Sequence, residues 1–130
     1  MPLVRIDAAT PDDSRLAAVG DAVHAALVST LGVPPDDVFQ VLGGAGRVRY
    51  DSDYLGVHRD DGVVFVQVVL RRGRGEELKR AFYADLAARA SVAGVEPRNL
   101  VVVLVENDAA DWSFGEGIAQ YVEGPHALPR

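Results

Sequence analysis

The fold is decided by the stretch Val63-Val64-Phe65-Val66-Gln67-Val68-Val69-Leu70. Its near-continuous run of β-branched and apolar residues predicts a strand buried on both faces, and therefore a central strand of a sheet. The segment Arg71-Arg72-Gly73-Arg74-Gly75 ends this strand, and a helix over about 76–93 follows. A further apolar strand at 100–105 completes a strand-helix-strand unit. The helix ends at Gly94, and its apolar stripe consists of Leu78, Phe82, Leu86, Ala90 and Ala93.

The residues before this stretch repeat the same order. A strand is predicted from Pro2 to Asp7, a helix from Thr10-Pro11-Asp12-Asp13 to Gly32, and a second strand over 38–42. We expect Thr10 to cap the helix and Pro11 to lie in its first turn. A turn at Gly43-Gly44-Ala45-Gly46 and a long polar connection with one short hairpin lead to Val63. The helix stripe consists of Leu16, Val23, Leu27 and Leu31.

These patterns predict an α/β (α+β) protein with a duplicated β-α-β fold, in which two helices lie on one face of a four-stranded sheet. With 130 residues against roughly 150 per domain, the chain is expected to be one domain. Its halves span about 1–60 and 61–110, and a C-terminal segment covers 111–130. Two helices cover only one face, so the other apolar face predicts an oligomer.

Composition narrows the classes of function. The chain has 13 Lys and Arg against 19 Asp and Glu, a net charge of −6, which argues against nucleic acid as a partner. It has no cysteine, which excludes disulfides, thiolate metal sites and cysteine nucleophiles, and fits a reducing compartment. Its apolar stretches are shorter than the ~20 residues of a membrane span, and its start lacks a signal-peptide pattern. We expect a cytoplasmic protein that binds no membrane.

Pro2 is the first candidate for chemistry. Removal of Met1 would leave Pro2 with a secondary amine at the start of an ordered strand. Such an amine, with an unperturbed pKa of about 8, can act as an acid, a base or an imine-forming nucleophile. The alternative is that proline follows methionine by chance.

The arginine segment and an acidic pair supply charge. Arg72 and Arg74 alternate to one side of an extended segment between a strand and a helix, a place where carboxylates and phosphates bind. The alternative is that these arginines form surface ion pairs with Glu76, Glu77 or Asp partners. The acidic pair Asp36-Asp37 could orient a water molecule or keep a nearby amine protonated. The alternative is that the pair only forms a turn.

Other motifs are less specific. His24 is expected to be a half-buried structural histidine, or to line a pocket against the sheet. No metal site is predicted, because His58 and His126 have no partner at ligand spacing, and Gly43–Gly46 lacks the residues of a phosphate-binding loop. The aromatic segment around Trp112 and Phe114 forms either a pocket wall or a subunit contact.

Together, several motifs resemble the tautomerase superfamily, and within it the malonate semialdehyde decarboxylases. They are Pro2-Leu3, Val33-Pro34 with Asp37-Val38-Phe39-Gln40, Arg72-Gly73-Arg74, and Glu106-Asn107 followed by Asp111-Trp112-Ser113-Phe114-Gly115. The resemblance covers nearly the whole chain. It implies a β-α-β duplication, a homotrimer, and decarboxylation of 3-oxopropanoate to acetaldehyde and carbon dioxide without metal or organic cofactor.

The resemblance also implies roles for individual residues. Pro2 corresponds to the catalytic amine and Asp37, rather than Asp36, to its carboxylate partner. Arg72 and Arg74 correspond to a clamp for the substrate carboxylate. Trp112 and Phe114 match the hydrophobic wall of the family. His24 matches a histidine that helps to bind substrate in this family and in the related chloroacrylic acid dehalogenases.

Two other functions stay open at this stage. A neutral Pro2 would suit keto-enol tautomerisation, and hydration of small 2-oxo or unsaturated acids is a related possibility. If Met1 were retained, the Pro2 nitrogen would be an amide, and the chain would be a trimeric scaffold or a module that binds small acids. Arg71 is an additional cation next to the predicted clamp.

Overall fold

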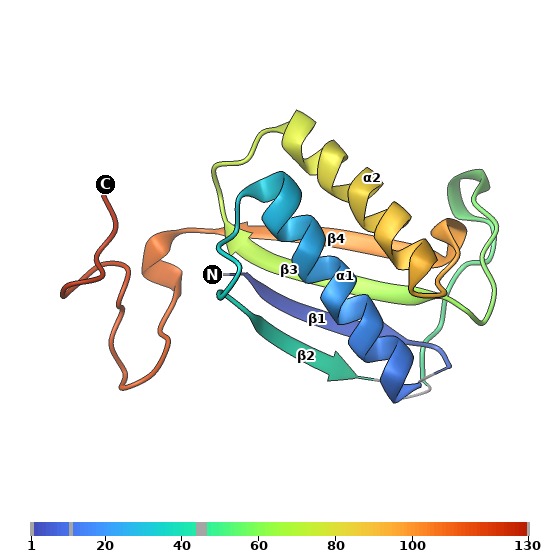
Figure 1. Cartoon of the computed structure of the whole chain (residues 1–130), viewed down its shortest axis with the longest axis horizontal. Helices are drawn as coiled ribbons and strands as arrows, with labels where there is room; N and C mark the ends of the chain where they lie inside the picture. Colours follow the sequence, from blue (N-terminus) through green and yellow to red (C-terminus); the bar gives the residue numbers. More distant parts are fainter. Residues whose placement is uncertain (1, 11, 44–46, 130) are drawn as a thin grey trace.

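The computed structural model describes residues 2–10, 12–43 and 47–129, which form one sheet covered by two helices (Figure 1). The main elements are β1 (Leu3–Ala8), α1 (Asp13–Leu31), β2 (Phe39–Gly43), β3 (Val64–Arg71), α2 (Glu76–Val92) and β4 (Leu100–Asn107). Three short 3₁₀ helices are η1 (Tyr54–Gly56), η2 (Pro97–Asn99) and η3 (Ala109–Asp111).

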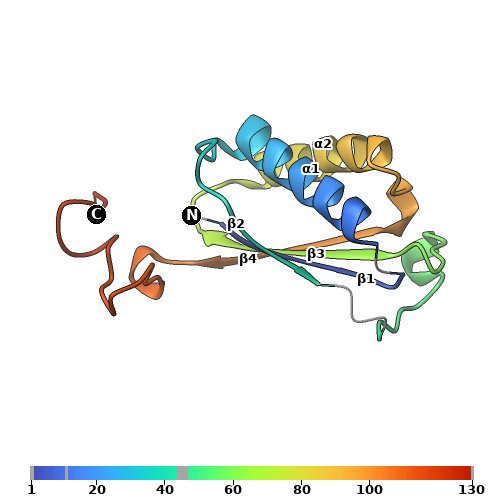
Figure 2. The ribbon, with the colours of Figure 1, turned by 60° about the horizontal axis from the view of Figure 1, so that its bottom comes forward.

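The strand order in the sheet is β2-β1-β3-β4. β1 and β2 are parallel, β3 and β4 are parallel, and the two halves meet through antiparallel β1 and β3. Each parallel pair is joined by a helix, and both helices lie on the same face of the sheet (Figure 2). The predicted β-α-β duplication is therefore confirmed.

Strand alternation and the helix stripes produce the core between the two layers. Val4, Ile6, Val66 and Val68 on the helix-covered face of the sheet are at most 1% exposed, and Phe82 of α2 is fully buried. The predicted stripe of α1 is buried along its length. In α2 the stripe begins one turn later than predicted, because Leu78 is 46% exposed.

The start of α1 differs from the prediction. Asp12, not Thr10, is the N-cap: its backbone is extended, and its side chain accepts a hydrogen bond from the Arg15 N–H at 3.0 Å. The Thr10 hydroxyl instead donates to the Asp61 carbonyl at 2.9 Å. The prediction for Pro11 falls outside the described residues. An acidic cap is favourable because the helix N-terminus is positive.

The connection between β2 and β3 also differs. Over residues 47–62 it contains η1 but no strand, so the short hairpin was wrong. Its end is fixed by Asp60, which accepts hydrogen bonds from the Gly62 N–H, Asn99 and Arg98 at 2.7 to 3.0 Å. Together these contacts lower the pKa of Asp60 to about 2. Residues 44–46 of the predicted glycine turn lie outside the described part of the chain.

The sheet face opposite the helices remains uncovered in the single chain. Phe65 and Val69 of β3 are only half-buried there, and Gln67 between them is exposed, so the predicted burial of this strand on both faces does not occur within one chain. Large apolar side chains on this face are 41–51% exposed; they are Leu3, Val41, Val103 and Val105. No helix in the described residues is long and apolar enough to cross a membrane.

Candidate active site

Pro2 lies at the end of the sheet where β1 begins. Leu3 pairs with Phe39 of β2 and with Val69 of β3, so Pro2 is level with Val38 and Leu70. Pro2 is buried. Because β1 and β2 begin at this end while β3 and β4 finish there, residues 37, 71–74 and 107 are brought to the same edge. Met1 lies outside the described residues.

Asp37 is held by the loop between α1 and β2. This loop begins at Gly32, which ends α1 in the left-handed conformation with φ of 70°. His24 of α1 donates from Nε2 to the Pro35 carbonyl at 2.8 Å, and the Asp37 N–H donates to the Pro34 carbonyl at 3.0 Å. His24 therefore supports the loop that presents Asp37. The substrate contact suggested for His24 stays a prediction.

The two predicted clamp arginines hold different partners. Arg72 donates from Nε to Asp108 at 2.5 Å, and this carboxylate raises the pKa of the Arg72 guanidinium. Arg74 donates to the Leu31 carbonyl at the end of α1 and to the Arg71 carbonyl at 3.2 Å. Burial lowers the pKa of Arg74, and the nearby Arg71 charge adds to that effect. The Arg74 guanidinium thus faces backbone carbonyls, while Arg72 faces a carboxylate.

Aromatic side chains from distant parts of the chain form a wall at this edge. Trp112 stacks on Phe114 with ring centroids 5.4 Å apart, and Phe114 also contacts Phe39 at 5.6 Å and Tyr121 at 5.0 Å. The Trp112 Nε1–H donates to the Asn107 side chain at 2.7 Å, which fixes the indole against the end of β4. The amphipathic indole is thus held by stacking on Phe114 and by a hydrogen bond to Asn107.

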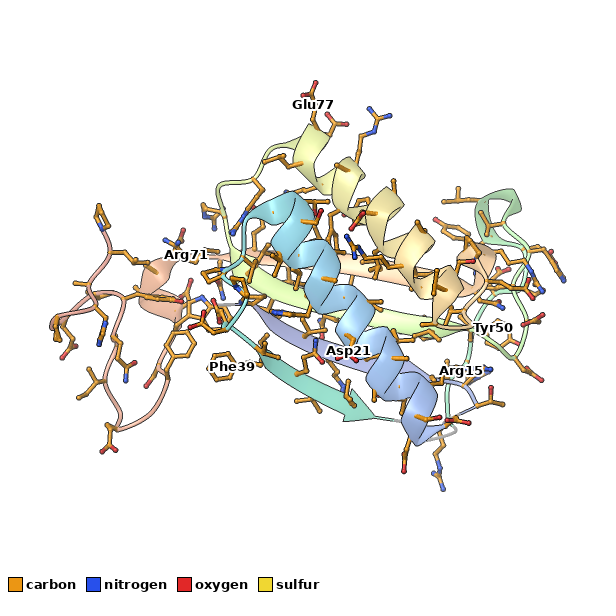
Figure 3. All side chains as sticks on the ribbon, in the orientation of Figure 1. Arg15, Asp21, Phe39, Tyr50, Arg71 and Glu77 are labelled. Carbon is orange, nitrogen blue, oxygen red and sulfur yellow. The ribbon has the colours of Figure 1, made fainter. Side chains whose placement is uncertain are left out.

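Arg71 joins this wall from the helix-free side of the sheet. Its guanidinium lies over the Tyr121 ring, 5.4 Å from the centroid. Figure 3 shows Arg71 and Phe39 at the same end of the molecule, next to the C-terminal segment, with Tyr50 at the opposite end. Burial raises the pKa of the Tyr121 hydroxyl, so this side chain stays protonated at neutral pH.

An open groove of about 420 Å³ lies between the Asp37 loop and the aromatic wall. Its lining includes Asp37, Phe39, Phe114, Tyr121 and His126. The carboxylates of Asp36 and Asp37, apolar rings and the polar tips of Tyr121 and His126 meet there, so this lining offers apolar contact and hydrogen bonds. Positive charge to attract a small organic acid would have to come from beside the groove, where Arg71 lies over the Tyr121 ring. A second hollow, of about 290 Å³, lies near Tyr50 and Val101 at the other end of the sheet, and none of the predicted site residues lines it.

Two models for families described as tautomerase enzymes match this chain, one over residues 41–115 and one over residues 2–43. The chain belongs to the tautomerase family. The probable tautomerase YrdN of Bacillus subtilis (strain 168) is 37% identical over 128 residues, which cover 95% of this chain and 98% of YrdN.

Solved structures point to one group within the family. The structure of FG41 malonate semialdehyde decarboxylase inhibited by 3-bromopropiolate is 36% identical, with a TM-score of 0.88, and the match covers 98% of this chain and 99% of that chain. Structures of wild-type, mutant and inactivated malonate semialdehyde decarboxylase, described as a basis for decarboxylase and hydratase activities, are 34% identical, with a TM-score of 0.80 over 92% and 95% of the chains. This member of the tautomerase family is thus similar to malonate semialdehyde decarboxylases.

The structure brings most of the predicted site residues to one edge of the sheet. Asp37 and Phe114 share the groove, and Trp112 supports Phe114. Pro2, Arg72 and Arg74 lie at the same end of the sheet, and His24 stands behind the loop. Among the described residues, no group of three or more His, Asp or Glu side chains is arranged to hold a metal ion.

The sequence assigned no role in this site to three residues that the structure places at this edge. Tyr121 and His126 line the groove, and Asn107 anchors Trp112. The Glu106-Asn107 motif at the end of an apolar strand was the available signal for Asn107, which the structure pairs with Arg71. Tyr121 and His126 lie in a segment without helix or strand periodicity, so no sequence pattern predicts where they fold.

Proposed function

We propose that this protein decarboxylates 3-oxopropanoate (malonate semialdehyde) to acetaldehyde and carbon dioxide, with Pro2 as its catalytic amine after Met1 has been removed. The observation that carries the proposal is the meeting of four features at one sheet edge. They are the buried start of β1, the loop that holds Asp37, the Arg72-Gly73-Arg74 turn after β3 (the arginine turn), and the groove lined by Phe39, Phe114 and Tyr121. The 36% identity to a malonate semialdehyde decarboxylase over 98% of the chain supports the same reaction.

The proposed reaction breaks the bond between the carboxylate carbon and C2. The electron pair of this bond moves toward the aldehyde and leaves an enolate, which takes a proton at C2 to give acetaldehyde. Catalysis therefore requires a group that stabilises negative charge on the aldehyde oxygen. A protonated Pro2 amine serves this purpose by hydrogen bonding, and an iminium formed between Pro2 and the aldehyde carbon is the covalent equivalent.

Arg72 and Arg74 are proposed to hold the carboxylate that leaves. Arg74 is the better placed of the two, because its half-buried guanidinium bonds neutral carbonyls, which an anion can replace. Arg72 would have to share or leave Asp108. The aromatic wall would exclude water from the enolate, and Asp37 would favour the protonated form of Pro2.

A proton NMR time course with 3-oxopropanoate tests this proposal. The native protein is expected to form acetaldehyde, and Pro2→Ala is expected to be slower by about 10²–10⁴-fold, the usual contribution of a positioned acid. Pro125→Ala, which changes an exposed proline, is the matched control and should keep full activity. Intact mass must show that each sample lacks Met1. Acetaldehyde formation no faster than in the buffer blank would refute the decarboxylase proposal.

Keto-enol tautomerisation is the second candidate, because YrdN is called a probable tautomerase. It needs a neutral Pro2 that moves protons, whereas decarboxylation needs a cationic one. Titration of ¹⁵N-labelled Pro2 separates them: an amine that is neutral at pH 7, together with turnover of phenylenolpyruvate, favours tautomerisation. Hydration of small unsaturated acids is a third reaction to assay on the same samples.

We also propose that the protein is a homotrimer. The uncovered sheet face, with Leu3, Val41, Val103 and Val105 half-exposed, supports association. Light scattering is expected to give three times the chain mass of 13.9 kDa. Val103→Glu places a charge in this face and should lower the measured mass, whereas Val92→Glu, at a 92% exposed position on α2, should leave it unchanged.

A further inference from the structure

The second hollow, near Tyr50 and Val101, is a counterpart of the groove at the first end of the sheet. Phe39, at the start of β2, lines the groove, and Phe114 of the segment that follows β4 packs on it. Val101, near the start of β4, lines the second hollow together with residues between 49 and 59 of the segment that follows β2. Each edge strand therefore begins next to the segment that follows the other one. Figure 1 shows these two segments at opposite ends of the sheet.

The two sites differ in charge. The groove lining includes Asp36 and Asp37 and, among the described residues, no lysine or arginine. The second hollow is lined by Arg49 and Arg59, and Asp51 is the one carboxylate among its described lining residues. The second hollow therefore attracts an anion more strongly than the lining of the groove does.

The aspartates of this segment have partners within it. The Asp51 carboxylate accepts the Asp53 N–H at 2.9 Å, and the Asp53 carboxylate is paired with His58 Nδ1 at 2.9 Å. By contrast, no carboxylate in the described part of the chain lies within ion-pair distance of Arg49 or Arg59. The positive charge of these two arginines is therefore not cancelled by a direct ion pair.

Arg59 is held in place, but one of its donors has no acceptor. Its backbone N–H donates to the Ser52 carbonyl at 2.8 Å, and its Nη1 donates to the Asp51 carbonyl at 2.7 Å. Its Nε atom is buried and has no hydrogen-bond partner among the described residues. A buried donor without an acceptor costs free energy, and a carboxylate is able to accept from Nε and Nη2 of an arginine in two parallel hydrogen bonds. Because Nε is buried, a ligand reaches it only when part of the lining shifts, and the exposed side chains of Asp51 and Tyr54 leave room for such a shift.

Apolar surface faces the same space. Phe65 of β3 and Val101 of β4 are partners in the sheet register, and both line the second hollow. The Tyr50 hydroxyl donates to Asp61 Oδ1 at 2.6 Å, which fixes the position of this ring, whereas Tyr54 is 63% exposed and can adjust to a ligand. A volume of about 290 Å³ with aromatic and aliphatic walls suits a molecule with one ring.

We propose that the second hollow is a binding site for small aromatic carboxylates, separate from the candidate active site. Arg59 holds the carboxylate through Nε and Nη2, and Arg49 adds a second positive charge. The ring of the ligand lies on Phe65 and Val101. This site does not depend on the reaction proposed for Pro2, because none of the proposed catalytic residues lines the second hollow.

Titration of benzoate into labelled native protein, followed by NMR, tests this inference. We expect shifts of the Val101 methyl signals and of the Arg59 Nε–H signal, with a dissociation constant of about 1 mM or lower. Arg59→Met should weaken benzoate binding at least about tenfold, because it removes both hydrogen bonds and the charge. Arg47→Met is the matched control: Arg47 is an exposed arginine of the same segment outside the lining, so the affinity should stay within about twofold.

Arg59→Lys separates the two hydrogen bonds from the charge. Lysine keeps the positive charge but lacks the planar donor pair of arginine, so benzoate should bind at least about fivefold more weakly than to the native protein. This conservative variant also keeps the test valid if Arg59→Met fails to fold. If Arg59→Lys binds benzoate as tightly as the native protein does, Nε is not the donor that holds the carboxylate, and the inference is wrong.

Two further probes test the class of ligand. Benzamide has the ring without the charge, and inorganic phosphate has the charge without the ring; each should bind at least about tenfold more weakly than benzoate. Equal affinity for either probe would overturn the inference.

The position of the shifts decides between the two ends of the sheet. Shifts confined to the surroundings of Phe114, or no shift at Val101 because another copy of the chain fills the second hollow, would also overturn the inference. Benzoate binding at Val101 in a protein that forms no acetaldehyde would support this inference and refute the proposed function.

Discussion

Gly20 lies in the middle of α1, where it packs against the side chain of Gln40 in β2. The Gln40 amide donates from Nε2 to the Gly20 carbonyl at 2.8 Å. A β-carbon built on Gly20 would lie 2.6 Å from Gln40 Oε1 and 3.4 Å from Leu42 Cδ2. This contact holds α1 against β2, the edge strand that follows the Asp37 loop.

Replacement of Gly20 by alanine brings two opposed effects. Alanine in a helix interior is more favourable than glycine by about 1 kcal/mol. The new methyl group must displace the Gln40 amide, and the lost hydrogen bond costs about 1 kcal/mol. Since only the end of a flexible side chain has to move, we expect Gly20→Ala to change the free energy of unfolding by no more than about 0.5 kcal/mol.

The same substitution has a different effect when the amide is absent. In a Gln40→Ala background the methyl group meets no amide, so Gly20→Ala should stabilise the protein by about 1 kcal/mol. The coupling between the two positions is therefore about 1 kcal/mol, which a double-mutant cycle resolves. Urea unfolding followed by circular dichroism measures all four proteins, at one protein concentration because association adds to stability.

Two results would refute this reasoning. Stabilisation by about 1 kcal/mol in both backgrounds would mean that the Gln40 amide does not restrict the space above Gly20. If Gly20→Ala lowers the free energy of unfolding by more than about 2 kcal/mol in both backgrounds, the new methyl group clashes with another group, such as the Leu42 side chain.

Three further predictions concern the core, the arginine turn and acid stability. Phe82→Ala removes a fully buried ring and should lower the free energy of unfolding in urea by about 3–5 kcal/mol, while Tyr83→Ala, at a 38% exposed neighbour, should cost far less. Gly73→Ala meets no neighbouring atom but must adopt φ of 132°, and the same assay should show a loss of about 1–3 kcal/mol. The pKa of Asp60 is lowered from 3.8 to about 2, so the stability it adds is present above pH 4 and is lost as the pH falls toward 2. Between pH 4 and 2 the free energy of unfolding should therefore fall less steeply with pH for Asp60→Asn than for the native protein. Equal slopes would contradict the lowered pKa of Asp60.

Much of the fold was readable from the sequence because its signals are local and periodic. The run from Val63 to Leu70 and the stripe from Leu16 to Leu31 specify a strand and a helix without knowledge of their partners. The cap of α1 was harder, since Thr10, Asp12 and Asp13 are all suitable caps. The cap is the last residue with an extended backbone before the helix begins. That residue is Asp12, with φ of −144° and ψ of 118°.

The candidate site was less predictable because its contacts join residues far apart in the chain. Arg74 bonds the carbonyl of Leu31, and Phe39 packs on Phe114. These pairs follow from strand order and register, which no single segment specifies. The spacing of Arg72 and Arg74 suggested a shared target, but the backbone turns at Gly73 and sends the two side chains to different partners.

Because β1 and β3 are antiparallel, the two ends of the sheet have the same arrangement of strands. At one end β1 and β2 begin and β3 and β4 finish; at the other end these roles are exchanged. Under the proposed function the basic amine is that of Pro2 at the first end, whereas the nitrogen that opens β3 belongs to a peptide bond. The position of the chain's N-terminus therefore decides which end of the sheet can carry a terminal amine. A circular permutant that starts with proline at residue 63 would carry the amine to the opposite end of an unchanged fold.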